Sequence, residues 1–370
     1  MSYERHDCRL CGGNVETKLR LNPTPVANAF PDADETSEFY DLELKQCVEC
    51  QHVQIGHIIP DDLIYSSRYK YSTPSVQIAA LKKQAESLKK QYPAARKVLE
   101  IGSNNGINLS CLKGVFDSVI GCDPVGNGLD TLPYAFDSVT ASMIGEVDLI
   151  VANNVFAHID NLVSVFRAMS NILNRNGAIV FEVQYFLDMA EKGLFDMIYH
   201  EHRDYHTVIP LVKFLQRFGL GIRKVEHLLN HGGSIRVHCG FGISAPMVEK
   251  SVDWEQFAES IDEYIAQCRR EILNSKAQVI AFGASAKACT LIHQLGMADK
   301  IAYCVDNTPA KQGKYIAGTN IEIYPESILT QSKSSKTLLL TAWNYKDVIM
   351  AKYPDFDFIV PFQQKQKLAA

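Results

Sequence analysis

Residues 199–202 read Tyr-His-Glu-His and place a phenol, two imidazoles and a carboxylate in four consecutive positions. Each of these groups can donate or accept a proton, and histidine does so most readily near neutral pH. Taken alone, such a run is more often a polar surface loop or a metal site. It lies downstream of a glycine-rich loop typical of a cofactor site, however. Proton abstraction coupled to group transfer needs both features.

The glycine-rich loop follows a short apolar strand expected over residues 98–101. Glycines let the backbone approach a ligand closely, and the helix expected from Ile107 supplies free N–H donors. Asp123 ends the next strand, about twenty residues on, and is placed to hydrogen-bond a ribose. Strands alternating with helices predict an α/β fold with a doubly wound parallel sheet. The expected cofactor residues are Glu100, Gly102, Ser103, Asn104, Gly106, Asp123, Asn153 and Asn154.

The loop differs from the Gly-x-Gly-x-x-Gly of dinucleotide enzymes. Its Glu-x-Gly-x-x-x-Gly pattern at residues 100–106 resembles motif I of class I S-adenosylmethionine (SAM) methyltransferases. In that fold the loop wraps the methionine part, and the acid after the second strand binds the ribose. Because Asp123 and the Asn153-Asn154 pair occupy matching places, we favour SAM over another nucleotide.

Four of the ten cysteines form two Cys-x-x-Cys pairs, Cys8 with Cys11 and Cys47 with Cys50. Each pair presents two thiolates from one tight turn, and two pairs complete a tetrahedral site suited to zinc. The alternatives are coincidental turns or a redox couple. Four thiolates leave no open coordination position, so we expect this zinc to hold the fold rather than do chemistry.

The composition is that of an ordinary globular protein of 370 residues with 46% hydrophobic and 21% charged residues. A net charge of -5 provides no basic field for nucleic acid, and no apolar stretch of about 18 residues suggests a membrane span. We expect a cytoplasmic monomer without nucleic-acid or membrane partners. The expected domains are residues 1–74 (zinc-binding), 75–200 (SAM-binding) and 201–370 (active-site segment with a C-terminal Rossmann-like unit).

The order of these parts closely resembles the sugar C-methyltransferases, which include the C-3 methyltransferases of branched deoxysugars such as tetronitrose. The resemblance covers nearly the whole chain. It is carried by the zinc pairs, the SAM loop, residues 199–202, and the segments 230–237, 282–287, 305–307, 311–314 and 342–345. Two places depart from the family pattern. Residues 203–206 (Arg-Asp-Tyr-His) are charged where the family has an uncharged, aromatic-bearing stretch, and the C-terminal glycine-rich turn carries Phe282 and Cys289.

The resemblance implies a nucleotide-linked 4-keto-6-deoxy sugar (dTDP- or GDP-linked) as substrate. By resemblance, His202 removes the proton at C-3 of the sugar, and the resulting enolate carbon attacks the methyl group of SAM. Tyr199 and Glu201 orient this base and the sugar, and His158 hydrogen-bonds the enolate oxygen. His231, before two glycines, marks a tight turn that either contacts the substrate or is only structural. The expected substrate contacts are one of Tyr69 and Tyr71, which closes over the sugar, together with His200, His231, Lys287 and Asn344.

Three other interpretations remain open at this point. An O- or N-methyltransferase would use the same SAM core without exchanging C–H protons of its substrate. An RNA-binding zinc protein is disfavoured by the pI near 6.1 and by the second α/β unit, whereas undiminished function after His202→Ala would favour a regulatory SAM sensor. Finally, His200, His202 and His206 could bind a catalytic metal, because residues two apart on a strand face the same way.

Overall fold

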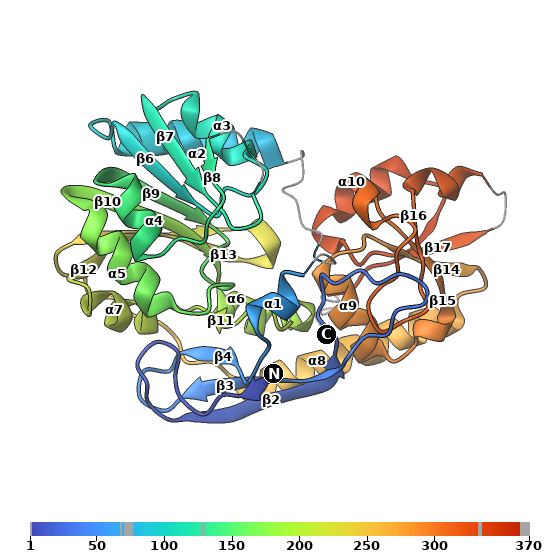
Figure 1. The fold of residues 1–370 in the computed structure, drawn as a ribbon. Coiled ribbons are helices and arrows are strands. Elements are labelled where there is room, and N and C mark those ends of the chain that lie inside the picture. Colours follow the sequence, from blue (N-terminus) through green and yellow to red (C-terminus); the bar gives the residue numbers. More distant parts are fainter. Residues whose placement is uncertain are drawn as a thin grey trace, which may run out of the picture.

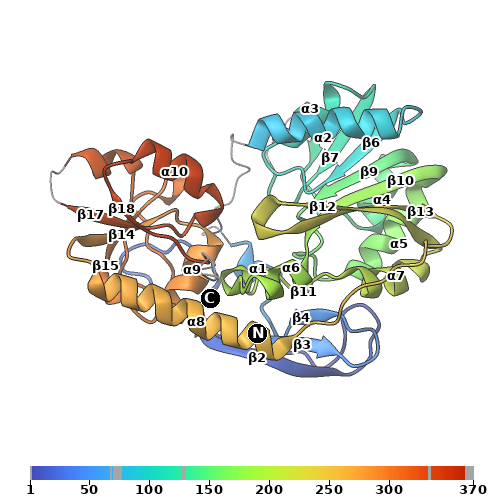
Figure 2. The same cartoon turned by 180° about the vertical axis from the view of Figure 1, so that it is seen from behind.

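The computed structural model describes residues 2–66, 69, 77–126, 128, 130–331 and 335–362. Figure 1 shows an N-terminal module (blue), a middle α/β unit (cyan to yellow) and a C-terminal α/β unit (orange to red). Seen from behind in Figure 2, helix α8 (Trp254–Asn274) runs along the underside of the C-terminal unit towards the N-terminal strands. No helix within the described ranges is long and apolar enough to cross a membrane.

The N-terminal module is built on a four-stranded antiparallel sheet with the order β11-β4-β3-β2. Strands β2 (Val15–Thr24), β3 (Tyr40–Cys47) and β4 (Val53–Ile55) are local to the module, whereas β11 (Asp204–Tyr205) comes from far along the chain. It pairs with β4 through Asp204 opposite Gln54 and Tyr205 opposite Val53. Strands β1 (Tyr3–Glu4) and β5 (His57–Ile58) and helix α1 (Asp61–Ile64) complete the module. The module therefore holds the segment that follows the Tyr-His-Glu-His run.

The middle unit contains a seven-stranded sheet with the order β12-β13-β10-β9-β6-β7-β8. Strands β6 to β10 are parallel, and β13 runs antiparallel to both β10 and β12. Helices α2 and α3 pack on one face, and α4, α5 and α7 pack on the other. Burial on both faces explains the near-continuous apolar runs of β6, β9 and β10. This is the doubly wound sheet that the sequence predicts. Its elements, in chain order, are α2 (Ile78–Gln91), β6 (Lys97–Ile101), α3 (Ile107–Lys113), β7 (Ser118–Cys122), β8 (Thr131–Leu132), α4 (Ser138–Ile144), β9 (Val147–Asn153), α5 (Leu162–Ile172), β10 (Leu173–Gln184), α6 (Phe186–Glu191), η2 (Phe195–Met197), α7 (Val208–Gln216), β12 (Leu220–Leu228), η3 (Asn230–Gly232) and β13 (Ser234–Phe241).

The seven-stranded sheet extends past residue 200, where we expected the SAM-binding domain to end. The pairing of β13 with β10 runs from Cys239 opposite Ile179 to Ser234 opposite Gln184. The boundary at 200 therefore falls inside this unit, and Phe241 is its last strand residue. Sequence motifs alone led us to place residues 201–241 with the C-terminal part. The other expected boundary, at residues 74 and 75, lies outside the described residues.

The C-terminal unit is a five-stranded, fully parallel sheet with the order β16-β15-β14-β17-β18. This order and the crossover helices make it Rossmann-like, as expected. A glycine-rich turn follows β14, and Gly283 has a φ of +105° where an added Cβ would lie 2.6 Å from Cβ of Ala342. After α8, its elements are β14 (Gln278–Phe282), α9 (Ala286–Leu295), η4 (Ala298–Lys300), β15 (Ile301–Val305), η5 (Pro309–Lys311), β16 (Ile323–Tyr324), η6 (Glu326–Thr330), β17 (Lys336–Leu339), η7 (Trp343–Tyr345), α10 (Lys346–Lys352) and β18 (Asp357–Ile359).

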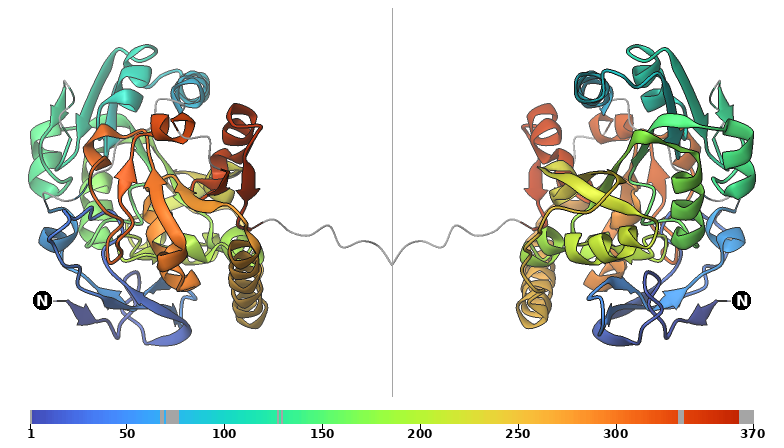
Figure 3. Two further views of the ribbon diagram at one scale, coloured as in Figure 1. Left: turned by 90° about the vertical axis from the view of Figure 1, so that its right-hand side faces the viewer. Right: turned by 90° about the vertical axis from the view of Figure 1, so that its left-hand side faces the viewer.

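One apolar core joins the N-terminal module, the segment around residues 186–199 and the C-terminal unit. It includes Leu44 of β3, Phe195 and Ile198 before the Tyr-His-Glu-His run, and Ile292 of α9. The side views in Figure 3 show the N-terminal strands and α8 beneath the two α/β units. The acid/base run therefore lies where all three parts meet.

Candidate functional site

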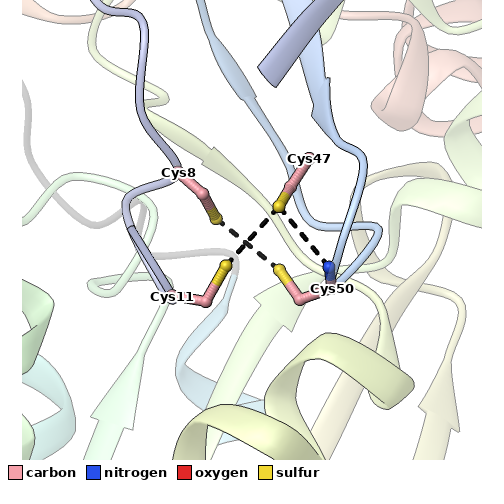
Figure 4. Close-up of side chains that lie close together, drawn as sticks. All are labelled: Cys8, Cys11, Cys47 and Cys50. Carbon is pink, nitrogen blue, oxygen red and sulfur yellow. Dashed lines mark hydrogen bonds between the residues drawn. The ribbon is translucent and has the colours of Figure 1, made fainter. Parts of the chain in front are cut away.

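The four cysteines of the two Cys-x-x-Cys pairs converge on one point (Figure 4). All four Sγ atoms lie within 4.8 Å of one another, with 3.6 Å between Cys8 and Cys50 and 3.5 Å between Cys11 and Cys47. Zinc–sulfur bonds of about 2.3 Å in a tetrahedron place the sulfurs about 3.8 Å apart. The four thiols therefore fit a structural zinc ion, as the sequence predicts.

Tight turns present these thiols as metal ligands. Gly12, with a φ of +82°, donates its N–H to the Cys8 carbonyl at 2.9 Å, and Cys50 N–H points at Cys47 Sγ at 3.4 Å. A hydrogen bond from Cys50 lowers the pKa of Cys8 to about 4. The cluster therefore favours a thiolate, the form that binds metal. Within the described ranges, no other group of three or more His, Cys, Asp or Glu side chains has metal-binding geometry. The alternative of a catalytic metal on His200, His202 and His206 thus finds no support.

The loop after β6 forms a backbone cradle. Gly102 and Gly106 have φ angles of +75° and +76°, and Asn104 has +46°. A Cβ at Gly102 would overlap the side chain of Val155, so only glycine fits there. Asn104 donates its N–H to Oδ2 of Asp123 at 2.9 Å, which fixes the loop against the end of β7. Ser103 lies deeper, with its hydroxyl 3.0 Å from that of Thr131.

Two acids flank this cradle and fit a nucleoside ligand. Asp123 accepts hydrogen bonds from the N–H groups of Asn104 and Val125, and each oxygen keeps a lone pair for a ribose hydroxyl. Glu100 accepts a bond from Asn108 Nδ2 at 2.6 Å, and its Oε2 has no partner among the described residues. Burial raises the pKa of Glu100 to about 8. A buried, partly unsatisfied carboxyl at this loop is consistent with a site that the cofactor completes.

The two asparagines after β9 differ in their surroundings. Asn153 exchanges a pair of 3.0 Å hydrogen bonds with Gln84 of α2, so its amide anchors that helix. Asn154 is exposed, has a φ of +56°, and donates its N–H to the Glu182 carbonyl at 2.8 Å. The structure thus leaves only Asn154 with its side chain open to a ligand.

His202 and Tyr199 form a closely packed pair. Tyr199 Oη lies 2.7 Å from His202 Nε2, and the ring centroids are 4.0 Å apart. His202 Nδ1 lies 3.1 Å from the Met197 carbonyl. Because a carbonyl only accepts hydrogen bonds, Nδ1 carries the proton and the phenol donates to the lone pair of Nε2. The ring is thereby fixed in the tautomer that a general base requires.

His158 faces the same imidazole from the loop after β9. The ring centroids of His158 and His202 are 4.9 Å apart. Burial, together with the charge of Arg203, lowers the pKa of His158 to about 4, so its ring is neutral at pH 7. Its Nδ1 is buried without a partner in the described part of the chain. This loop also contains Val155, which touches Gly102, so it links the cofactor cradle to the histidine pair.

Glu201 and His200 point into the N-terminal module instead. Glu201 Oε1 accepts bonds from the Asn28 N–H at 2.7 Å and from Asn28 Nδ2 at 3.3 Å, and burial raises its pKa. His200 is fully buried, with Nε2 3.1 Å from the Asp41 carbonyl and its ring against Tyr40. Both side chains contact the N-terminal module, and their expected orienting and substrate-binding roles stay predictions.

The tyrosine segment after α1 approaches the site through Tyr65 and Tyr69. Tyr69 forms a β-bridge with Ala29, next to the Asn28 that holds Glu201, and its ring packs edge-on against Tyr65 at 5.0 Å. Burial raises the pKa of Tyr65, and the charges of Glu201 and Asp123 are close enough to add to the shift. Tyr65 is therefore a partly buried phenol that packs against Tyr69. Tyr71 lies outside the described residues.

A buried polar cluster connects the catalytic segment with the C-terminal unit. Lys287 Nζ donates to Asn344 Oδ1 at 2.6 Å and lies 4.5 Å from the centre of the Trp343 ring. Trp343 Nε1 donates to Asp196 Oδ2 at 2.6 Å. Burial lowers the pKa of Lys287 to about 8 and raises that of Asp196 to about 6. The two expected substrate contacts are thus brought together.

The turn that contains His231 packs against this cluster. Gly232 and Gly233 have φ angles of +86° and +144°, and a Cβ at Gly232 would lie 2.9 Å from Cη2 of Trp343. The structure places the His231 backbone in η3 and does not describe its side chain. The tight turn between two strands that the sequence suggests is therefore present.

Sequence reasoning did not single out Tyr65 or Asp196. Asp196 is a fully buried carboxylate within the otherwise apolar run of residues 195–198. A charged residue in such an apolar run is the sequence signal that could have identified it. Tyr65 was only one of three tyrosines in a segment without a clear period. Nothing in its local pattern distinguishes it from the other two.

Three protein-family models match consecutive parts of the chain. The "Putative zinc binding domain" matches residues 8–65, the "Methyltransferase domain" matches 75–225, and the "C-methyltransferase C-terminal domain" matches 244–361. The chain is also 26% identical to the C-methyltransferase NovU of Streptomyces niveus, over 98% of this chain and 97% of that protein.

Solved structures with similar parts include the magnesium protoporphyrin IX methyltransferase ChlM from Synechocystis PCC 6803 (14% identity, TM-score 0.35, covering 47% of this chain and 90% of that one). A SAM-dependent methyltransferase from Clostridium acetobutylicum ATCC 824 is similar at 14% identity and a TM-score of 0.36, covering 49% of this chain and 96% of that one.

The sheet order, the cofactor cradle and the family matches together define a SAM-dependent C-methyltransferase with a structural zinc site. The three models together cover most of the chain, which confirms the resemblance to C-methyltransferases found in its sequence.

Proposed function

We propose that this protein methylates C-3 of a nucleotide-linked 4-keto-6-deoxyhexose by way of an enolate, in the biosynthesis of branched deoxysugars. The observation that carries the proposal is the paired Tyr199 and His202, with the His202 proton fixed on Nδ1 by Met197. Bound SAM supplies an electrophilic methyl group. The cradle of Gly102, Asn104 and Asp123 is the part of this chain that would hold it.

The proposed chemistry starts with removal of a proton from the carbon next to the ketone. Such a proton is acidic because the resulting charge delocalises onto oxygen, and a positioned imidazole is a suitable acceptor. His202 receives it at Nε2, and the Met197 carbonyl stabilises the imidazolium through Nδ1–H. His158, whose ring centroid lies 4.9 Å from that of His202, is the second imidazole beside the reacting carbon, and its unpartnered Nδ1 accepts a hydrogen bond from a sugar hydroxyl.

The C-terminal unit supports a nucleotide-linked substrate. Lys287 provides a buried amino group at the start of α9, and the Ser285 hydroxyl at the same helix end has no partner among the residues described. A cation, a hydroxyl and free helical N–H groups are suited to a diphosphate. Asn344 holds Lys287 in place and offers further hydrogen bonds to a sugar.

The test is incubation in D2O with SAM and a panel of dTDP- and GDP-linked 4-keto-6-deoxyhexoses, followed by NMR and mass spectrometry. We expect a carbon-bound methyl group at C-3, and deuterium at that carbon when SAM is omitted. His202→Gln is the matched control, because it keeps an amide nitrogen near the position of Nε2 but cannot act as a base. A methyl group on oxygen or nitrogen would contradict the proposal in favour of an O- or N-methyltransferase. SAM binding without transfer to any member would favour a sensor or another substrate.

A further inference from the structure

Arg9 lies between the zinc ligands Cys8 and Cys11, but its side chain reaches two distant segments of the chain. The side chain is 1% exposed. Its Nε lies 3.0 Å and 3.1 Å from the two carboxylate oxygens of Asp204. Its Nη2 donates to the carbonyls of Ile159 and Asp160 at 2.6 Å and 2.8 Å. One guanidinium therefore bridges residues 159–160 and residue 204.

These two segments carry the histidine pair. Ile159 directly follows His158, and Asp204 lies two residues after His202. The segments are also joined directly, because Arg203 donates its N–H to the Ala157 carbonyl at 2.6 Å and its Nη1 to the His158 carbonyl at 3.2 Å. These contacts hold the segment after His158 against the segment after His202. Other residues of the N-terminal module, such as Ile59, also contact Arg203, but Arg9 contacts both segments from the turn between two zinc ligands.

The ion pair between Arg9 and Asp204 is fully buried. Burial alone would raise the pKa of Asp204, but the charge of Arg9 and a 2.8 Å hydrogen bond with His52 outweigh it and hold the pKa well below its usual range. Asp204 is therefore charged at neutral pH and needs its partner. A guanidinium presents donors in a rigid planar fork that the single ammonium of lysine cannot reproduce.

Strand β4 of the same module holds the Arg9 backbone. Arg9 N–H donates to Gln54 Oε1 at 2.8 Å, and Gln54 is the residue of β4 that pairs with Asp204. We propose that Arg9 is a positioning residue through which the zinc module sets the relative placement of His158 and His202. This inference rests on the proposed role of that histidine pair.

Arg9→Gln and Arg9→Lys test this role, with Arg5→Gln as the matched control. Arg5 lies in the same module but forms an exposed pair with Asp7. We expect Arg9→Gln to retain zinc and to show faster amide hydrogen exchange in residues 157–160 and 202–206, but not at the cysteine turns. Its kcat should fall about 100-fold, as for a displacement of roughly 1 Å, with the KM for SAM changed less than about twofold. Arg9→Lys should recover only part of kcat, and Arg5→Gln should match the wild type.

Asp204→Asn provides an independent variant, because it breaks the same ion pair without touching the zinc turns. It should reproduce the exchange pattern and the loss of kcat, and the double variant Arg9→Gln/Asp204→Asn should be no worse than either single one. Unchanged exchange in both segments, or additive losses in the double variant, would overturn the inference. Hydrogen exchange needs no substrate, so it tests Arg9 even if the C-3 methylation proposed above fails.

Discussion

The phenol oxygen of Tyr199 lies 2.7 Å from Nε2 of His202, the nitrogen that has to take the substrate proton. Because Nδ1 of the same ring is committed to the Met197 carbonyl, the phenol donates to the lone pair of Nε2. An arriving substrate must therefore either displace the Tyr199 hydroxyl or pass its proton through it. The two routes predict different losses of activity when the Tyr199 hydroxyl is removed.

His202→Gln should abolish C–H exchange and methyl transfer, with a loss of at least about 10²-fold, while SAM affinity stays unchanged. Tyr199→Phe keeps the imidazole and removes only the hydroxyl, so we expect a smaller loss of about tenfold. Exchange in D2O followed by NMR and SAM titration by calorimetry measure the two quantities. Equal losses in the two variants would instead make the phenol the immediate proton acceptor.

Asp123→Ala should weaken SAM binding by more than about tenfold, because the loop loses its anchor at Asn104 and the ribose loses an acceptor. Asp130→Ala is the control, since Asp130 is an exposed acid paired with Lys113. Calorimetry with SAM would measure both affinities. Equal binding by the two variants would show that Asp123 is not a cofactor residue.

Cys47→Ser should lose zinc and destabilise the N-terminal module, because a structural metal site contributes its binding energy to folding. Metal analysis and thermal unfolding measure the two effects. Cys111→Ser changes a buried cysteine outside the cluster and should keep one zinc per chain. A Cys47 variant with full zinc content would exclude Cys47 as a ligand.

Acid should destabilise the protein partly through His200. Burial lowers the pKa of His200 to about 4, from an ordinary value of about 6.5. Between these values the unfolded chain binds a proton that the folded chain does not, so stability falls as the pH drops from 6.5 to 4. This histidine alone accounts for about 3 kcal/mol across that window. Urea unfolding at pH 7 and pH 4.5 should show a smaller loss for His200→Gln, and equal losses would disprove the assignment.

Features that are local in sequence could be predicted well. Local sequence determines the geometry of the two cysteine pairs and of the loop of residues 100–106, because neighbouring residues form the whole turn. The directions in which the side chains of residues 199–202 point could not be predicted in the same way. Tyr199 and His202 face one another, while His200 and Glu201 face Asp41 and Asn28.

Those directions depend on tertiary packing of segments distant in sequence. Strand β11 joins the N-terminal sheet about 150 positions after β4, and no periodicity of the local sequence indicates that pairing. The same reason explains the misplaced boundary at residue 200. Strand β13 carries part of a family motif but completes the earlier sheet through hydrogen bonds with β10, and β12 pairs with β13 at the edge of that sheet.

Lys287 should make the use of the sugar nucleotide depend on pH. Burial lowers its pKa to about 8, although the charge of Asp196 opposes the shift. The free enzyme therefore loses this positive charge as the pH rises through 8, where an ordinary lysine would remain protonated. Since kcat/KM reports groups of the free enzyme, we expect kcat/KM for the sugar nucleotide to fall between pH 7 and pH 9, with SAM binding unaffected. Lys287→Arg keeps its charge throughout and should flatten this part of the profile, whereas Lys287→Met should be low at all pH values. A wild-type profile that is flat from pH 7 to pH 9 would mean that Lys287 does not contact the diphosphate.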